Sequence, residues 1–346
     1  MDTTQHTATH PTRLWAGVDL AKRTFVGAIW GHQAFQDRRV RSFPRTEEGI
    51  AEFLDWLKAE AGPGTPLGVV MEATGAFGLE AGLWLTRLDP DLHVAIANPH
   101  RTCAYISSLG LRNKTDDLDA RALAGYGQER RPRGWEPMRP ERKELQEFVR
   151  TRALLVEQQT AIRLSLKDHT RSAELAAQAM EQVLATLAEQ IAALEEGISR
   201  LVKAHPDLKR CVGRMTSIKG IGLITAVTVL AEIGDPSRFL RSRQLAALAG
   251  MSPRRKDSGT SVHGRTRMCK QGSALVRSTL YMAAQSAVRF NPDMARVYTE
   301  HIARGNHWRS GIGVVMRKLL VLMRAVVIAD HDWVPQVRTV GMAVKA

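Results

Sequence analysis

At 346 residues the chain is long enough for two or three domains that each bury a core. Its formal net charge of +14 at pH 7 points to a polyanionic partner, with nucleic acid as the first candidate. The three cysteines are scattered, so they suggest neither a disulfide framework nor a zinc site. The polar first residues lack the apolar core of a signal peptide, and the most apolar late run, 311–329, contains three bases. We therefore expect a cytoplasmic protein without a membrane span.

Residues 1–12 predict a flexible tail, and residues 13–137 predict an α/β domain. Apolar runs and period-2 alternation indicate strands, while the spacing after Thr46, a plausible cap, indicates an amphipathic helix. Strands come first as a meander and then alternate with helices, as in a sheet covered by helices. The predicted strands are 14–20, 24–30, 39–43, 67–72 and 92–97, and the predicted helices are 46–57 and 78–88.

Residues 138–206 predict a central helical coiled-coil segment, because 141–204 contains no proline and few glycines. Its second half has apolar residues spaced alternately four and three apart, which is a heptad seam of about three heptads. An antiparallel helical pair, a dimerising coiled coil and two helices packed on their own domain all fit this pattern. The seam residues are Met180, Leu184, Leu187, Ile191, Leu194, Ile198 and Leu201.

Residues 207–333 predict a mainly helical C-terminal domain with helices at 273–288 and 311–329, followed by a tail at 334–346. Segment 217–226 is typical of a helix-hairpin-helix element. Gly220 and Gly222, beside Lys219, open a tight turn whose amides at the start of the next helix are able to receive a phosphate. Many helix–helix turns use glycine for steric reasons alone, so a purely steric role for these glycines is the alternative to phosphate binding.

A polar loop at 250–261 opens the most basic part of the chain. From 254 to 277 seven bases face one acid, Asp257, which exceeds what solubility requires. We expect this run to bind nucleic acid. Its bases are Arg254, Arg255, Lys256, Arg265, Arg267, Lys270 and Arg277.

Four carboxylates stand out by position. Asp19 ends the first predicted strand and Glu72 ends another, where burial of an unpaired charge is costly. Asp116 and Asp119 are three residues apart at the start of a predicted helix and so share a face, while Asp117 points elsewhere. Acids also favour helix N-termini for electrostatic reasons, but the four together are less readily explained in that way. They suit two Mg²⁺ or Mn²⁺ ions that act at phosphorus.

These residues occur in motifs that resemble the DEDD transposases of bacterial insertion sequences, the "one-ten" family. The similarity spans roughly residues 14–330. The motifs are Gly-Val-Asp19-Leu-Ala-Lys, Met-Glu72-Ala-Thr-Gly, Asn98-Pro99, Lys114-Thr-Asp116-x-x-Asp119-Ala-Arg, the segment from Gly220 to Gly222, Ala249-Gly-Met-Ser-Pro, Asp257-Ser258-Gly259 and Lys270-Gln-Gly-Ser-Ala-Leu-Val-Arg277.

The resemblance implies a RuvC/RNase H-like N-terminal domain and site-specific DNA recombination that moves a mobile element. It also implies a serine nucleophile beside the metal-binding acids, a structured RNA that guides the choice of donor and target DNA, and assembly into dimers and tetramers. Ser258 occupies the position of the nucleophile. Members often have two serines before the glycine and another glycine after it, whereas this chain has Asp257-Ser258-Gly259-Thr260, so Ser252 and Ser261 remain rivals.

Two alternatives remain open. One is a RuvC-like junction nuclease in which metal-activated water attacks and the serine is incidental. The other is a non-catalytic nucleic-acid-binding protein whose acids are structural. Dependence on a divalent metal separates the second alternative from the enzymes, and a covalent protein–DNA adduct separates the recombinase from the nuclease.

Overall fold

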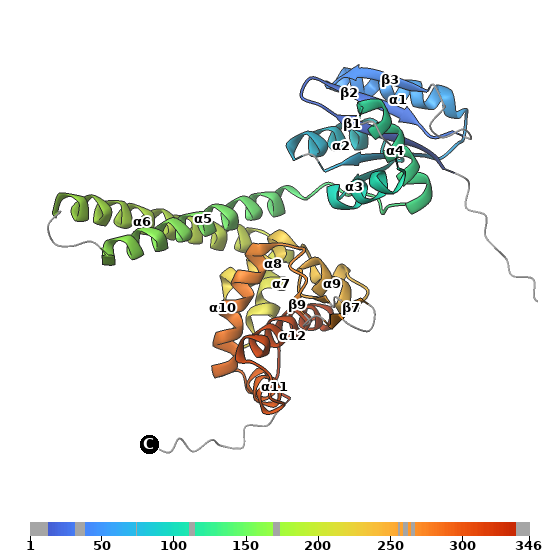
Figure 1. Cartoon of the computed structure of the whole chain (residues 1–346). Coiled ribbons are helices and arrows are strands. Elements are labelled where there is room, and N and C mark those ends of the chain that lie inside the picture. Colours follow the sequence, from blue (N-terminus) through green and yellow to red (C-terminus); the bar gives the residue numbers. More distant parts are fainter. Residues whose placement is uncertain are drawn as a thin grey trace, which may run out of the picture. The chain divides into compact units, whose positions relative to one another are not determined.

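The structure is a computed structural model that describes residues 13–31, 39–73, 75–110, 115–168, 174–254, 257–258, 262–263 and 267–336. The chain divides into two compact units, Met1–Pro137 and Met138–Ala346 (Figure 1). None of the described helices is both long and apolar enough to cross a membrane.

Unit 1 is built on a five-stranded mixed sheet with the order β3-β2-β1-β4-β5 (Figure 1). The first three strands form an antiparallel meander, and β1, β4 and β5 run parallel. The parallel part requires crossover connections, and helices supply them. The strands are β1 (Leu14–Leu20), β2 (Thr24–Ile29), β3 (Val40–Pro44), β4 (Leu67–Glu72) and β5 (His93–Ala97).

Helices cover both faces of this sheet. One face packs Val18, Phe25 and Met71 against α1 (Glu47–Ala61) and α2 (Ala76–Leu88). Thr46 caps α1 by accepting a hydrogen bond from the Gly49 amide, as its sequence position predicts. The opposite face packs against α3 (Pro99–Ser108) and α4 (Asp116–Arg130) through a smaller cluster. That cluster contains Trp15, Val70, Ala95, Ala97, Tyr105, Leu123 and Tyr126.

Helix α4 lies unusually close to β1. A Cβ atom placed on Gly17 would lie 2.0 Å from the Ala120 carbonyl oxygen and 2.3 Å from the Ala124 nitrogen. A Cβ on Gly127, near the other end of α4, would meet the Trp15 ring at 2.5 Å. Residue 15 of β1 therefore lies beside residue 127 of α4, whereas residue 17 lies beside residue 120. The two elements run antiparallel, and the first turn of α4 lies toward the end of β1.

Unit 2 begins with an antiparallel helical pair, α5 (Pro140–Asp168) and α6 (Glu174–Ala204) (Figure 1). A Cβ on Gly197 would touch Phe148 at 3.4 Å, and Arg152 pairs with Glu195 at 2.7 Å, so the numbering runs in opposite directions along the two helices. The predicted seam residues of α6 are buried or half-buried, most completely Ile198 at 0% exposed. Within one chain, the heptad pattern thus serves an antiparallel pair.

The remaining helices of unit 2 form one continuous core together with the beginning of α5 and the end of α6. These helices are α7 (Pro206–Thr216), α8 (Leu223–Glu232), α9 (Ser242–Leu248), α10 (Ala274–Phe290), α11 (Pro292–Ala303) and α12 (Trp308–Ala329). The polar loop expected at 250–261, together with the residues that follow it, contains two-residue strands. They are β6 (Pro253–Arg254), β7 (Asp257–Ser258), β8 (Val262–His263) and β9 (Arg267–Met268).

The close contact at Gly17 gives a first prediction. We expect Gly17→Val to lower the free energy of unfolding of unit 1 by about 1–3 kcal/mol or more, because the added side chain overpacks against the backbone of α4. Valine itself favours strands, so strand propensity is not the cause. Urea unfolding followed by tryptophan fluorescence reports on unit 1, which holds five of the seven tryptophans.

Gly213→Ala is the matched control, since a Cβ there meets nothing within 4 Å. It replaces a glycine in helix α7 of unit 2 and should leave the transition of unit 1 unchanged. A Gly17→Val protein that unfolds like the wild type would show that α4 does not approach β1 in this way.

Candidate functional site

Asp19 and Glu72 lie side by side at one edge of the sheet. β1 and β4 are parallel and pair Val18 with Met71, and the two acids are the next residues of their strands. Strand alternation puts both on the face that packs against α3 and α4, together with Trp15 and Val70. Both side chains are half-buried. The sheet register therefore brings together two acids that are 53 positions apart in the sequence.

Helix α3 supplies a partner for Glu72. The Thr102 hydroxyl lies 3.2 Å from Glu72 Oε1 and 3.0 Å from the Pro99 carbonyl oxygen, so its one proton is shared between two acceptors, and Thr102 is fully buried. Asn98 caps this helix by accepting from the His100 amide, and Pro99 occupies its first turn. Burial raises the pKa of Tyr105 on the same helix above its usual value. Sequence reasoning missed Thr102, although Asn98-Pro99 is a recognisable helix start.

The first turn of α4 carries the other two acids. Thr115 caps the helix by accepting from the Leu118 amide. Asp119 is half-buried, whereas Asp116 and Asp117 are exposed. Asp116 lies one turn before Ala120, which contacts Gly17, so the antiparallel course of α4 brings the first turn toward Asp19. The structure therefore gathers the predicted acids at one end of unit 1.

A divalent cation fits this donor set by its chemistry, since carboxylate oxygens are the ligands that Mg²⁺ and Mn²⁺ prefer. Among the described residues, no group of three or more acids, histidines or cysteines is already drawn together tightly enough to hold an ion. Carboxylates that share an edge repel one another, and a cation between them reverses that repulsion. The placement of the acids agrees with a metal site. The described acids are less closely grouped than the ligands around a bound ion.

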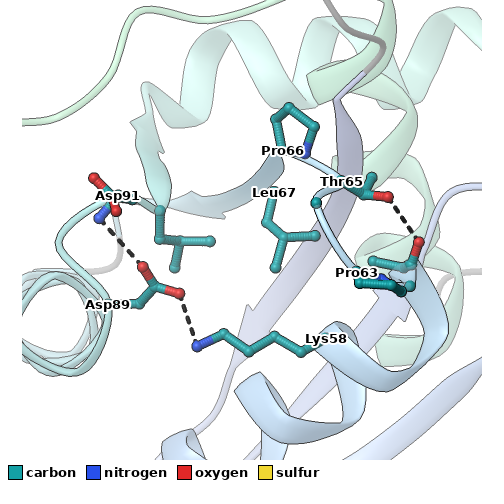
Figure 2. Close-up of a pocket in the computed structure, with 11 residues that line it drawn as sticks. Lys58, Pro63, Thr65, Pro66, Leu67, Asp89 and Asp91 are labelled. Carbon is teal, nitrogen blue, oxygen red and sulfur yellow. Dashed lines mark hydrogen bonds and ion pairs between the residues drawn. The ribbon is translucent and has the colours of Figure 1, made fainter.

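The opposite end of the parallel strands has a different character. A hollow there is lined by the loop before β4 and the loop before β5 (Figure 2). Lys58 Nζ lies 2.9 Å from Asp89 Oδ2, and Asp89 also accepts from the Asp91 amide. Lys58 and Asp89 of this hollow are therefore paired with each other. It lies beside Leu67 at the start of β4, away from Glu72 at its end.

The segment with Ser258 in unit 2 forms two short antiparallel ladders. β6 pairs with β9, and further along the loop β7 pairs with β8, which sets Ser258 opposite Val262. For Arg254, Ser258 and Arg267 the structure describes the backbone only. Four other residues predicted from the sequence to belong to the site lie outside the described residues. They are Arg255, Lys256, Ser261 and Arg265.

The root of this loop is held by backbone contacts. The Lys270 amide donates to the Gly250 carbonyl at 2.9 Å, and the Cys269 amide donates to the Ser252 carbonyl at 2.9 Å. A Cβ on Gly272 would lie 2.2 Å from the Leu248 carbonyl oxygen, so only glycine permits the approach. Ser252 thus lies at the root, away from the ladder that contains Ser258.

Arg277, predicted to bind nucleic acid, has a further set of contacts. Its Nη1 donates to the Gly272 carbonyl at 2.9 Å and to the Ala249 carbonyl at 3.3 Å. These carbonyls belong to the two segments that meet at the root of the loop. Arg277 therefore joins the two sides of the root, whereas Lys270 is exposed.

The segment predicted to be a helix-hairpin-helix element forms the turn between α7 and α8. Gly220 has φ +99°, and a Cβ there would lie 2.7 Å from the Ala287 Cα. Glycine is therefore required at this position for steric reasons. A Cβ on Gly222 would meet nothing within 4 Å, and no side chain caps the first turn of α8. Lys219 beside it is exposed. The two glycines thus have different surroundings.

Acids gathered at a sheet edge, together with a strongly basic chain, agree with an enzyme that acts on nucleic acid. Comparison with known proteins identifies this enzyme class more narrowly. A model described as "Transposase", of the DEDD type from IS110, matches residues 16–173, and one described as "Transposase IS116/IS110/IS902 family" matches residues 212–299. The chain belongs to the IS110 family of transposases, enzymes that cut and rejoin DNA and whose DEDD type implies a divalent metal ion.

Two relatives illustrate the family. The chain is 30% identical over 321 residues to the pilin gene-inverting protein of Moraxella lacunata, an alignment that covers 91% of this chain and 96% of that protein. It is 30% identical over 252 residues to the transposase for insertion sequence element IS1111A of Coxiella burnetii, which covers 64% of this chain and 66% of that protein. The recombination activity that the sequence predicted is thereby confirmed at the level of the family.

Thr102 gives a prediction for this activity. We expect Thr102→Val, which keeps the shape but removes the hydroxyl beside Glu72, to raise the Mg²⁺ concentration needed for half-maximal DNA cleavage by about 10–100-fold. Thr102→Ser keeps the hydroxyl and should stay close to the wild type. Equal metal dependence for the valine variant and the wild type would remove Thr102 from the site.

The contacts of Arg277 give another prediction. Because its guanidinium bonds backbone carbonyls, we expect both Arg277→Ala and Arg277→Lys to lower the melting temperature of unit 2 and to slow recombination. The salt dependence of DNA binding should not change in Arg277→Lys, which keeps the charge. The alternative is a phosphate contact, and it predicts that lysine restores both stability and recombination.

Proposed function

We propose that the chain is a site-specific DNA recombinase that moves a mobile element, with Ser258 as nucleophile and Asp19, Glu72, Asp116 and Asp119 as ligands of Mg²⁺ or Mn²⁺. The observation that carries the proposal is the gathering of the four acids at one end of unit 1, by the register of β1 with β4 and by the packing of α4 on Gly17. The family membership supplies the DNA substrate.

The sheet supports an RNase H/RuvC-like interpretation of unit 1. Its order is β3-β2-β1-β4-β5, with a three-stranded antiparallel meander followed by parallel strands. Acids at the ends of the first and fourth strands, and on a later helix that packs across the sheet, agree with that fold. We also propose the domain division of residues 13–137, 138–206 and 207–333 with tails at either end.

In the proposed reaction the Ser258 oxygen attacks a DNA phosphorus and loses its proton, while the bond from phosphorus to a neighbouring sugar oxygen breaks. The DNA is then joined to the serine, and the released strand end carries a hydroxyl that later reverses the step. A cation held by the acids supplies positive charge to the phosphate and lowers the pKa of hydroxyl groups nearby. The acids and the serine lie in different units of the chain, and the proposal requires both to act on one phosphate.

The charged residues of unit 2 support the choice of partner. Their positive charge neutralises phosphates of donor and target DNA and of a structured guide RNA, whose base pairing selects sequences without a recognition helix. The proposed contacts are Arg254, Arg255, Lys256, Arg265, Arg267 and Lys270 in the loop and its root, with Lys219, Gly220 and Gly222 in the turn before α8.

Assembly into dimers or tetramers belongs to the same proposal. Large apolar side chains on the helical pair α5–α6 are left exposed, among them Leu154 at 54%, Leu164 at 57% and Leu175 at 82%. Apolar side chains that form one exposed patch commonly mark a surface of association, and the proposal places these leucines in such a surface.

Replacement of each acid by its amide tests the proposal. Asp19→Asn, Glu72→Gln, Asp116→Asn and Asp119→Asn keep the size of each side chain and remove its charge, so we expect strand cleavage to fall at least about 100-fold while DNA binding stays within a factor of about two. Cleavage of a labelled DNA junction and its binding are measured on the same preparations.

Asp117→Asn is the matched control. It removes an exposed acid from the same turn of α4 and should leave cleavage nearly unchanged. If Asp117→Asn is as damaging as Asp116→Asn, the choice of ligands on α4 is wrong. If all four variants remain active, the acids are structural, as in the non-catalytic alternative.

A further inference from the structure

The turn between α11 and α12 carries an exposed group of aromatic and basic side chains. Trp308, the first residue of α12, is 46% exposed. The Arg309 guanidinium carbon lies 5.1 Å from the centre of the Trp308 ring, and the His307 ring lies 5.7 Å from it at an interplanar angle of 30°. Arg304 and Asn306 in the same turn are exposed as well.

Hydrogen bonds brace this turn. The Asn306 amide nitrogen donates to the His301 carbonyl at 3.0 Å, and His301 Nε2 lies 2.9 Å from the Ser310 hydroxyl. His307 caps α12 by accepting from the Arg309 amide at 3.2 Å. The backbone of the turn and the His307 ring are therefore held in place before any partner arrives, which lowers the entropy cost of binding a ligand there.

The charge around the group has one sign. From Arg304 to Ala329 the sequence contains five bases and no acid. Arg324 is used within the fold, where it bonds the Phe239 and Leu240 carbonyls, but Arg304 is exposed. A cationic surface attracts phosphates. A flat aromatic ring beside it adds a surface on which an unpaired base stacks, the combination that proteins use to bind single strands.

The group also lies close to the loop that carries Ser258. Helix α12 packs against β9, since a Cβ on Gly313 would lie 3.4 Å from the Met268 Cε. Arg309 is one turn before Gly313 on the same side of the helix. β9 pairs with β6 at the root of the loop. The group therefore flanks the root through which the loop that carries Ser258 is connected to unit 2.

We propose that the turn Arg304–Arg309 binds single-stranded DNA, with an unpaired base stacked on Trp308 and the neighbouring phosphates against Arg304 and Arg309. Cutting and rejoining DNA requires strands to part from their partners, and a stacking site beside the loop holds an unpaired base during that exchange. The inference rests on DNA recombination by the family and does not require Ser258 to be the nucleophile.

Trp308 has a structural alternative. It stands one turn before Ile312 and two before Val315, both buried, so it continues the apolar stripe of α12. On that account its removal lowers stability and affects all nucleic acids equally. The stacking proposal instead predicts a loss confined to single strands and recovery with another aromatic ring.

The experiment measures the affinity of the full chain for a fluorescein-labelled twelve-nucleotide thymidine strand and for a duplex of the same length. Stacking of one base is worth about 1–3 kcal/mol, so we expect Trp308→Ala and Trp308→Leu to weaken single-strand binding about 5–100-fold. Trp308→Phe should recover most of it, and duplex binding should change less than about twofold in all three. Leu240→Ala, an exposed apolar residue of the same unit at 89%, is the control and should change neither affinity.

A second measurement uses the wild-type chain and so does not depend on how variants fold. A strand that contains 5-iodouracil is irradiated with the protein, and the cross-linked peptide is identified by mass spectrometry. A cross-link at His307 or Trp308 supports the proposal. Cross-links found only at other residues would overturn it. So would variants that lose equal affinity for single strands and duplex, or a Trp308→Leu variant that binds single strands as the wild type does. A loss of affinity for the matching RNA strand but not for DNA would overturn it as well.

Discussion

The contact between Gly17 and the backbone of α4 is the constraint on which unit 1 depends. It lets the helix approach β1 so closely that its direction and position along the strand are fixed. The acidic first turn of α4 then lies at the same end as the acids of β1 and β4. Acids at a helix N-terminus are stabilised by the helix dipole, so the fold tolerates the acids that the proposed chemistry needs.

Unit 2 uses glycine in the same way. At Gly272 the chain after the loop passes within contact of the Leu248 carbonyl, and at Gly220 the turn before α8 packs on the backbone of α10. Arg277 then bonds carbonyls from both sides of the loop root. In each unit a segment that carries predicted site residues is anchored by contact with backbone atoms, which are positioned more rigidly than side-chain ends.

Much of unit 1 followed from the sequence because its strands are apolar runs and their acids lie at the ends. Helix α3 was missed because its buried face consists of Thr102 and Tyr105, so it shows no apolar stripe, although Asn98-Pro99 marked its start. The strands around Ser258 have two residues each, too few for periodicity to reveal them. The contacts of Arg277 could not be inferred either, since a positive charge suits a phosphate and a backbone carbonyl equally well.

The central claim is that an acidic metal site and a serine act on one phosphate, and a covalent adduct tests it most directly. A junction DNA is incubated with the protein and Mg²⁺, the reaction is stopped by denaturant, and any attached peptide is identified by mass spectrometry. The account predicts DNA joined to Ser258, lost in Ser258→Ala and strongly reduced in Asp19→Asn. An adduct on Ser252 or Ser261 would reassign the nucleophile. Cleaved DNA with free 5′-phosphate ends and no attached peptide would contradict the account and favour the metal-dependent nuclease.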